Sequence, residues 1–97
     1  MVRPTPLAQS AVDTFITQHR GWERAATGAL VKGYTFPDFA SALAFVVRLG
    51  CYAEKRDHHP DVELSWGRAR VAWSTHDAGG VTELDVAAAE ATDKLAE

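Results

Sequence analysis

Apolar residues recur at the three- to four-residue spacing of a helix in three stretches of this chain. Thr5 and Pro6 suit the N-cap and first turn of the first helix. Thr82 and Asp85 have the spacing of a capping box at the start of the third. The predicted helices and their apolar positions are residues 5–21 (Leu7, Ala11, Phe15, Ile16), about 38–57 (Phe39, Leu43, Val46, Gly50, Ala53) and 82–95 (Leu84, Ala88, Ala91, Leu95).

Two further stretches carry the signals of β-hairpins. Residues 21–36 are rich in strand formers and are interrupted at Thr27-Gly28, which suits a turn. Residues 62–76 alternate apolar and polar positions, with Gly67 at the turn between them. The order helix, two strands, helix, two strands, helix predicts an α+β fold, in which a four-stranded antiparallel sheet carries three helices packed on one face.

The central helix has a second apolar row, made by Phe45, Leu49 and Tyr52. Its hydrophobic arc is therefore wider than one face of a sheet needs to cover. We expect this row to form a helix–helix contact between copies of the chain. Trp22 and Trp66 are expected in the core.

Length and composition indicate one globular domain spanning residues 1–97, with 46% hydrophobic and 24% charged residues. No apolar run approaches the ~20 residues needed to cross a bilayer, and the N-terminus lacks the pattern of a secretory signal, so we expect a cytoplasmic protein. A net charge of −3, with both signs interspersed, favours a small-molecule or protein partner over nucleic acid or a membrane. The lone Cys51 is interpreted as a small buried hydrophobe.

Histidines form the one cluster of titratable side chains that suggests chemistry. Three of the four histidines lie between positions 58 and 76, near Glu54, Asp57 and Asp85. Glu54 precedes His58 by four residues, so the two would share a helical face, and such a partner fixes the tautomer of a ring. Pro60 should end the helix before the His58-His59 pair and leave it on an exposed turn. His76 is predicted at the end of a strand, on the same side as Ser74.

The histidines and Asp85 also have interpretations other than acid/base chemistry. Paired histidines on a loop are often solvated polar residues. A zinc site of His58, His59 and His76 is conceivable, although neighbouring residues rarely direct both side chains at one ion. Asp85 is also explained as a helix cap, and His19 as a favourable contact with the end of the first helix.

A longer motif surrounds the histidines. Residues 53–60 read AEKRDHHP, and Trp66, the Ser-Thr-His run at 74–76 and Asp85 follow at set distances. This arrangement resembles the signature of the pterin-4a-carbinolamine dehydratase family. The resemblance extends over about residues 5–97 and is much more specific than any single pair of residues.

The resemblance implies the α+β fold described above and assembly into homodimers or homotetramers through strand edges and the central helix, with Phe45, Leu49 and Tyr52 at the interface. It also implies a pterin site built from two segments. These contain Asp57, His58 and His59 on one loop, and Ser74, Thr75, His76 and Asp77 on the other. Asp77 stands where the family usually has Glu, and Ala78 where Cys is common, and neither change removes a proton-transfer group.

The activity implied is that of a 4a-hydroxytetrahydrobiopterin dehydratase, a hydro-lyase of tetrahydrobiopterin recycling that needs neither a metal nor an organic cofactor. His58 is expected to be the principal acid/base, with His59 and His76 assisting. The side chains expected to orient or tune these rings are Glu54, Asp57 and Asp85. The substrate would be a pterin, supplied by an aromatic amino acid hydroxylase pathway. The alternative is a non-catalytic assembly factor, or a coactivator of transcription, on the same fold.

Overall fold

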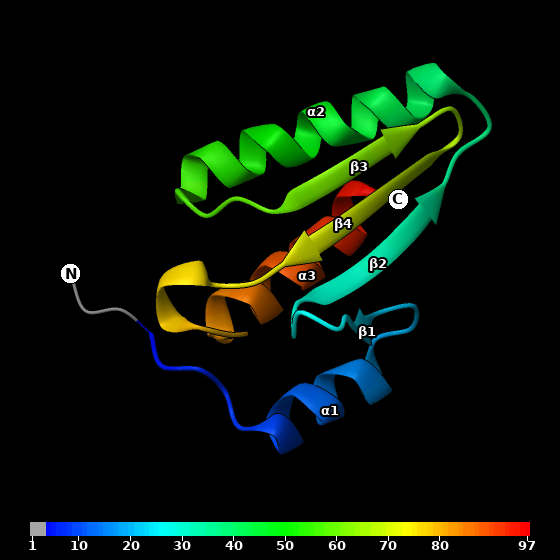
Figure 1. The fold of residues 1–97 in the computed structure, drawn as a ribbon. Coiled ribbons are helices and arrows are strands. Elements are labelled where there is room, and N and C mark those ends of the chain that lie inside the picture. The colour runs from blue at the N-terminus through cyan, green and yellow to red at the C-terminus, as the bar shows by residue number, and fades with distance from the viewer. Residues whose placement is uncertain (1–3) are drawn as a thin grey trace.

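Three helices and four strands follow one another in the predicted order within residues 4–97, the part of the chain that this computed structural model describes (Figure 1). The expectation about a signal sequence partly concerns residues 1–3, which lie outside that part. The elements are α1 (Gln9–Gln18), β1 (Glu23–Arg24), β2 (Leu30–Thr35), α2 (Phe39–Arg56), β3 (Asp61–Ser65), β4 (Arg68–Trp73), the short 3₁₀ helix η1 (His76–Ala78) and α3 (Glu83–Leu95).

The strands form one antiparallel sheet in the order β1-β2-β4-β3. β2 pairs with β4 over six residues, so the two predicted hairpins join through their inner strands. A tight turn at Gly67 sets the register of β3 against β4. A side chain at Gly67 would place its Cβ 2.9 Å from the carbonyl oxygen of Phe36, which explains why glycine stands there.

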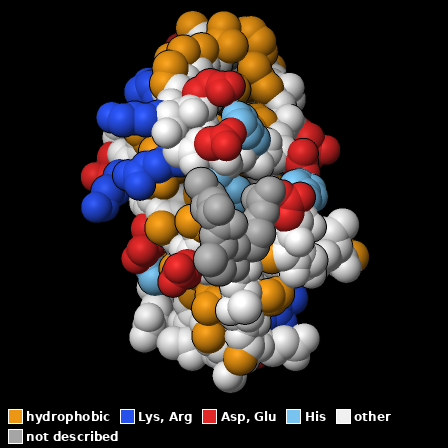
Figure 2. Space-filling model, turned by 90° about the vertical axis from the view of Figure 1, so that its left-hand side faces the viewer, with side chains coloured by type: hydrophobic (Ala, Val, Ile, Leu, Met, Phe, Trp, Pro, Cys, Tyr) orange, Lys and Arg blue, Asp and Glu red, His pale blue; other side chains and the backbone are white. Residues whose placement is uncertain are grey.

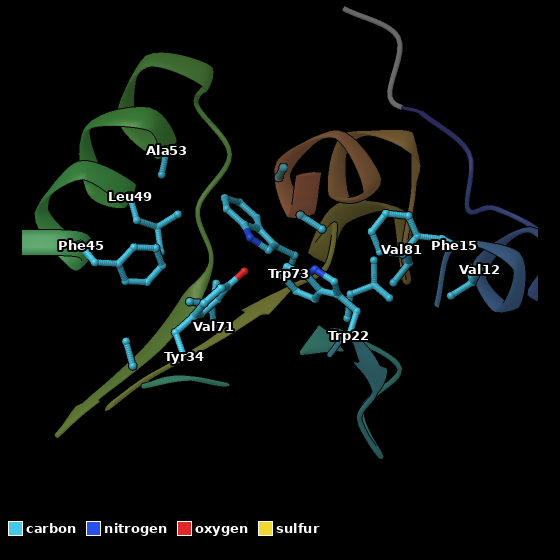
Figure 3. Packing of buried hydrophobic residues seen from close by; sticks show 14 residues of the cluster. Val12, Phe15, Trp22, Tyr34, Phe45, Leu49, Ala53, Val71, Trp73 and Val81 are labelled. Carbon is cyan, nitrogen blue, oxygen red and sulfur yellow. The ribbon is translucent and has the colours of Figure 1, made fainter. Parts of the chain in front are cut away.

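One face of the sheet is buried and the other is open. Ala69, Val71 and Trp73 alternate along β4 and are fully buried. Figure 3 shows Phe45, Leu49 and Ala53 of α2 pointing toward this face, and Val12 and Phe15 of α1 in the same cluster. Ala88 and Ala89 of α3 complete the cluster. All three helices therefore pack against the same face, as the sequence predicts.

The predicted oligomer row on α2 is wrong. Phe45 and Leu49 are 0% and 1% exposed and lie in the core of the chain itself, and Tyr52 is partly buried. The large apolar side chains that are exposed on α2 are Phe39, Leu43 and Val47, at 45%, 43% and 57%. Both rows have helical spacing, and only the position of the sheet determines which row it covers.

Two helix predictions also shift. The N-cap of α1 is Ala8, because the preceding segment is extended and the Leu7 amide donates to the Val81 carbonyl at 2.8 Å. Thr5 and Pro6 therefore lie before the helix. On α3, Leu84 is 44% exposed and Ala91 and Leu95 are only partly buried. The residues of α3 that are buried are Asp85, Ala88, Ala89 and Thr92.

Two single-residue expectations are wrong as well. Cys51 lies on the uncovered side of α2 and is exposed. Trp66 occupies the turn between β3 and β4, where its side chain meets solvent and is 69% exposed. Trp22 is buried as predicted.

Asp93 of α3 anchors that helix to the sheet. Its carboxylate accepts hydrogen bonds from the Trp22 indole at 3.1 Å, the Lys32 ammonium at 2.7 Å and the Tyr34 hydroxyl at 2.5 Å. Burial alone would raise the pKa of Asp93, but these donors hold that pKa below its usual value. Burial, followed by the nearby carboxylate, raises the pKa of Tyr34.

Candidate active site

The register of the second hairpin brings the two candidate segments together. Asp61 pairs with Ala72, and the ladder ends there on both strands. The chain before β3 and the chain after β4 therefore leave the sheet at the same end, where α2 also ends (Figure 1). Figure 2 shows histidine and acidic side chains gathered on this end of the molecule.

The end of α2 directs the histidine pair. Asp57 caps the helix in a left-handed conformation, with φ 52°, and its amide donates to carbonyls of the last turn. Asp tolerates this conformation better than most residues. The His58 amide then donates to the Ala53 carbonyl at 3.2 Å. This reversal turns the two histidine side chains in different directions.

His58 points into the molecule. Its side chain is only 14% exposed, and its ring stacks on Trp73 with a centroid distance of 5.2 Å and an angle of 27°. Nε2 lies 2.6 Å from Oδ1 of Asp85. The expectation of an exposed His58 paired with Glu54 is therefore wrong, because the left-handed cap rotates the ring away from the helix face that carries Glu54.

Asp85 is completely buried and uses both of its carboxylate oxygens. Oδ2 accepts from the Thr82 amide and from the Thr75 hydroxyl, each at 2.8 Å, while Oδ1 faces His58. The first contact completes the predicted capping box of α3. One side chain thus combines the two interpretations of Asp85, as helix cap and as partner of an imidazole.

His59 lies at the surface, with its side chain 55% exposed. Its Nε2 is 3.4 Å from both carboxylate oxygens of Glu54, whose side chain is 76% exposed. Glu54 therefore contacts His59 rather than His58. The long distance and the solvent make this a weak contact.

The segment after β4 divides between the two faces of the sheet. Thr75 continues the buried row of Trp73 and is 5% exposed, whereas Ser74 continues the open face. His76 is not the end of a strand, as the sequence predicts, but the first residue of η1. It is exposed, as is Asp77 in the same short helix.

Two hollows flank this end of the molecule. A groove of about 480 Å³ runs along the open face, between Ser74 and His76 at one end and Glu63 and Arg70 toward the other, and Asp61 also lines it. A smaller hollow of about 190 Å³ lies beside His58 on the helical side. His76 lines the groove, and His58 lines the smaller hollow.

Within residues 4–97, no three His, Cys, Asp or Glu side chains are grouped as metal ligands would be. No helix in that part of the chain is long and apolar enough to span a membrane. The three imidazoles are suited to proton transfer. His58 is held by a buried carboxylate, and His59 and His76 are exposed to solvent.

Comparison with known families identifies the family of this chain. The family model described as pterin 4 alpha carbinolamine dehydratase matches residues 5–95. The chain belongs to this family. A relative from Rhizorhabdus wittichii is 51% identical over 69 residues, which is 71% of each chain. One from Mycolicibacterium smegmatis is 42% identical over 89 residues, which is 92% of this chain and 94% of the relative. Both are named provisionally as pterin-4-alpha-carbinolamine dehydratases.

Solved structures share the fold. The structure described as a transcriptional coactivator/pterin dehydratase from Brucella melitensis has a TM-score of 0.90 and 32% identity, and covers 96% of this chain and 100% of its own. A pterin dehydratase-like protein described as a RuBisCO assembly factor of the α-carboxysome has a TM-score of 0.70, covers 80% of this chain and 92% of its own, and is 22% identical. The second likeness shows the fold alone.

Sequence reasoning missed two residues of this site. Trp73 supports the His58 ring, and Thr82 contacts the Thr75 hydroxyl at 2.8 Å. The alternation along β4 carries a signal for the first, because it places Trp73 and Thr75 on the same face. Only the packing of α3 against that face brings Thr82 and Asp85 to them.

Proposed function

We propose that this protein is a 4a-hydroxytetrahydrobiopterin dehydratase, which eliminates water from the pterin 4a-carbinolamine to give the quinonoid dihydropterin during tetrahydrobiopterin recycling. The observation that supports the proposal is the pair formed by His58 and the fully buried Asp85, with 2.6 Å between Nε2 and Oδ1. Membership of the family supports the reaction class.

The reaction needs two proton transfers. A proton reaches the hydroxyl group on C4a, which departs as water as the C4a–O bond breaks. N5 loses its proton, and the electron pair of that N–H bond forms the C4a–N5 double bond. The net change is loss of one water molecule. Imidazoles suit both transfers, because their unperturbed pKa lies near the working pH, and one positioned group contributes about 10²–10⁴-fold.

We assign His58 as the principal acid/base because it alone of the three rings is held by a buried carboxylate. His59 and His76 would bind the pterin edge and assist with protons at the solvent side. The remaining proposed site residues, which orient these rings or contact the substrate, are Glu54, Asp57, Ser74, Thr75, Asp77 and Asp85.

A stopped-flow assay with synthetic 4a-hydroxytetrahydropterin tests the proposal. We expect dehydration well above the spontaneous rate, with the same rate in the presence of EDTA, since the proposed mechanism uses side chains alone. The matched control is His58→Gln, which keeps a donor toward Asp85 and removes the titrating ring. A wild-type rate equal to the spontaneous rate would reject the dehydratase, and loss of activity with EDTA would reject the mechanism.

We also propose that the protein forms homodimers or homotetramers. Phe39, Leu43 and Val47 give α2 an exposed apolar row, and β3 is an edge strand of the sheet. In Figure 2, uncovered hydrophobic side chains lie at the top of the molecule, where α2 lies in Figure 1. Burying such a row against a second copy removes apolar surface from water. A cytoplasmic location and service to an aromatic amino acid hydroxylase belong to the same proposal.

The second candidate is a non-catalytic assembly or coactivator-like factor, and the apolar row on α2 is the feature that favours it. Such a protein would use the helix surface and would need no pterin. Calorimetric titration with 7,8-dihydrobiopterin separates the two functions, because a pure binding module has no affinity for it.

A further inference from the structure

A series of hydrogen bonds connects the start of α3 to His58, and the direction of each donor follows from the proton count of the hydroxyl groups. The Thr75 hydroxyl has a single proton and donates it to Oδ2 of Asp85 at 2.8 Å. The contact of 2.8 Å between the hydroxyls of Thr75 and Thr82 must therefore be donated by Thr82. The series runs from Thr82 to Thr75 to Asp85, and His58 meets Asp85 from the other side.

This series determines how the carboxylate is oriented. Oδ2 has two donors, the Thr75 hydroxyl and the Thr82 amide, and an amide can only donate. Oδ1 is consequently the oxygen left for His58, and it is an acceptor. When Asp85 is ionised its carboxylate can only accept, so the proton of this hydrogen bond is on Nε2 of the ring. Within residues 4–97, Nδ1 of His58 has no hydrogen-bond partner.

We propose that Thr75 is a positioning residue, which acts through Asp85 to keep the His58 proton on Nε2 and to leave Nδ1 as the nitrogen that exchanges protons with the substrate. This inference rests on the proposed dehydratase function and deepens it. It also revises the role of Thr75, whose hydroxyl is occupied on the buried side of β4 and is not available as a pterin contact.

Asp85→Asn tests the orientation directly. The Asn oxygen must take the place of Oδ2, because the Thr82 amide and the Thr75 hydroxyl both need an acceptor there. The amide nitrogen then faces His58 and donates to Nε2, so the proton of the neutral ring moves to Nδ1. Proton–nitrogen NMR correlations of the ¹⁵N-labelled, substrate-free protein distinguish the two tautomers, and the His58→Gln protein identifies which signals belong to His58.

We expect the Nε2–H tautomer in the unaltered protein and the Nδ1–H tautomer in Asp85→Asn. An Nδ1–H ring in the unaltered protein, or the same tautomer in both, would overturn the inference. An Nδ1–H ring has no lone pair on Nδ1 with which to accept a proton, so we expect turnover in Asp85→Asn to fall by at least about 10²-fold.

Thr75→Val and Thr75→Ser examine the threonine while keeping both residues of the α3 capping box, Thr82 and Asp85. Val removes the hydroxyl at nearly constant volume, whereas Ser keeps it. We expect Thr75→Val to move the His58 imidazole signals and to lower kcat by at least about tenfold with KM unchanged. In Thr75→Ser, the His58 signals and kcat should both return to those of the unaltered protein. Ser74→Ala, which removes the neighbouring hydroxyl on the open face, should leave the His58 signals where they are.

A rise in KM with kcat unchanged in Thr75→Val would instead make Thr75 a substrate contact, and unmoved His58 signals would reject positioning. The NMR measurements need no substrate. If the unaltered protein lacks dehydratase activity but shows these signals, the proposed function fails and the orientation of His58 stands. If it is active and Thr75→Val behaves as unaltered protein, the function stands and this inference fails.

Discussion

At the scale of single residues, His58 combines a packed ring with a proposed role in proton transfer. Its ring rests on Trp73, and its Nε2 contacts a carboxylate that has no solvent exposure. Removing the whole side chain therefore has two consequences. It deletes the proposed acid/base and it leaves Oδ1 of Asp85 buried without a partner, which costs stability.

His58→Gln separates these consequences. We expect kcat to fall by at least about 10²-fold, because the titrating group is gone. The glutamine amide can still donate toward Asp85, so the free energy of unfolding should fall less than in His58→Ala, where about 1–3 kcal/mol is lost. Stopped-flow turnover and thermal melts of both variants check this. A His58→Gln protein with unaltered turnover would remove His58 from the mechanism.

His76 is expected to behave in the opposite way. It is exposed at the end of the open groove, and within residues 4–97 it is not part of the hydrophobic core cluster. His76→Ala should therefore leave the melting temperature unchanged while weakening the binding of 7,8-dihydrobiopterin by about 1–3 kcal/mol, the cost of an unpaired polar contact. Calorimetric titration measures the loss, and equal affinities in the two proteins would exclude His76 from the site.

At the scale of elements, α2 has two apolar rows in different surroundings. Phe45 and Leu49 face the sheet, and Phe39, Leu43 and Val47 face away from it. The hydrophobic periodicity was sufficient to predict the helix and its bounds nearly to the residue, ending at Arg56. It could not tell which row is inside, because that depends on where the sheet lies.

Charged substitutions on the two rows should have different outcomes. Leu43→Glu should reduce the mass measured by light scattering, because a charge in an apolar contact between copies would have no partner. The fold should stay intact, because residue 43 is exposed to water in the single chain. Phe45→Glu should instead unfold the chain, because the charge would be buried without a partner. Far-UV circular dichroism separates loss of fold from loss of assembly. An unchanged mass for Leu43→Glu would exclude this row from an interface between copies.

At the scale of the whole molecule, Asp93 connects α3 to the first hairpin through the three side chains that it accepts from. Its pKa is lowered in the folded state, so the stability it contributes is present above the ordinary pKa of an Asp carboxyl. That contribution is lost as the pH falls through the lower, folded-state pKa. The anchor should therefore weaken in acid.

We expect Asp93→Asn to lower the free energy of unfolding by about 1–3 kcal/mol near neutral pH, with the difference from the unaltered protein shrinking as the pH falls below the ordinary range of Asp. Denaturant titrations at several pH values measure this. Asp13→Asn is the matched control, because the ion pair of Asp13 with Arg24 is exposed and should contribute little. A difference that does not change with pH would contradict the charged anchor.

The sequence by itself determined the order of elements and the fold class. Helix and strand periodicities are local properties, so they can be recognised without knowing which surface each element packs against. It also located the three histidines and the capping box of α3. The turn at Gly67 was readable as well. The register itself comes from the structure, in which the ladder between β3 and β4 ends at Asp61 and Ala72, so that residues 58–60 and 74–76 both lie beyond that end.

Only the tertiary structure decided which groups meet. Asp85 lies 27 residues after His58, yet they form the closest contact of the site because α3 packs against the face of β4 that carries Trp73 and Thr75. Glu54, four residues before His58, is turned away from it by the left-handed cap at Asp57. Local spacing can propose a neighbour along a helix, but pairing across the core depends on how the elements pack, which no stretch of sequence contains by itself.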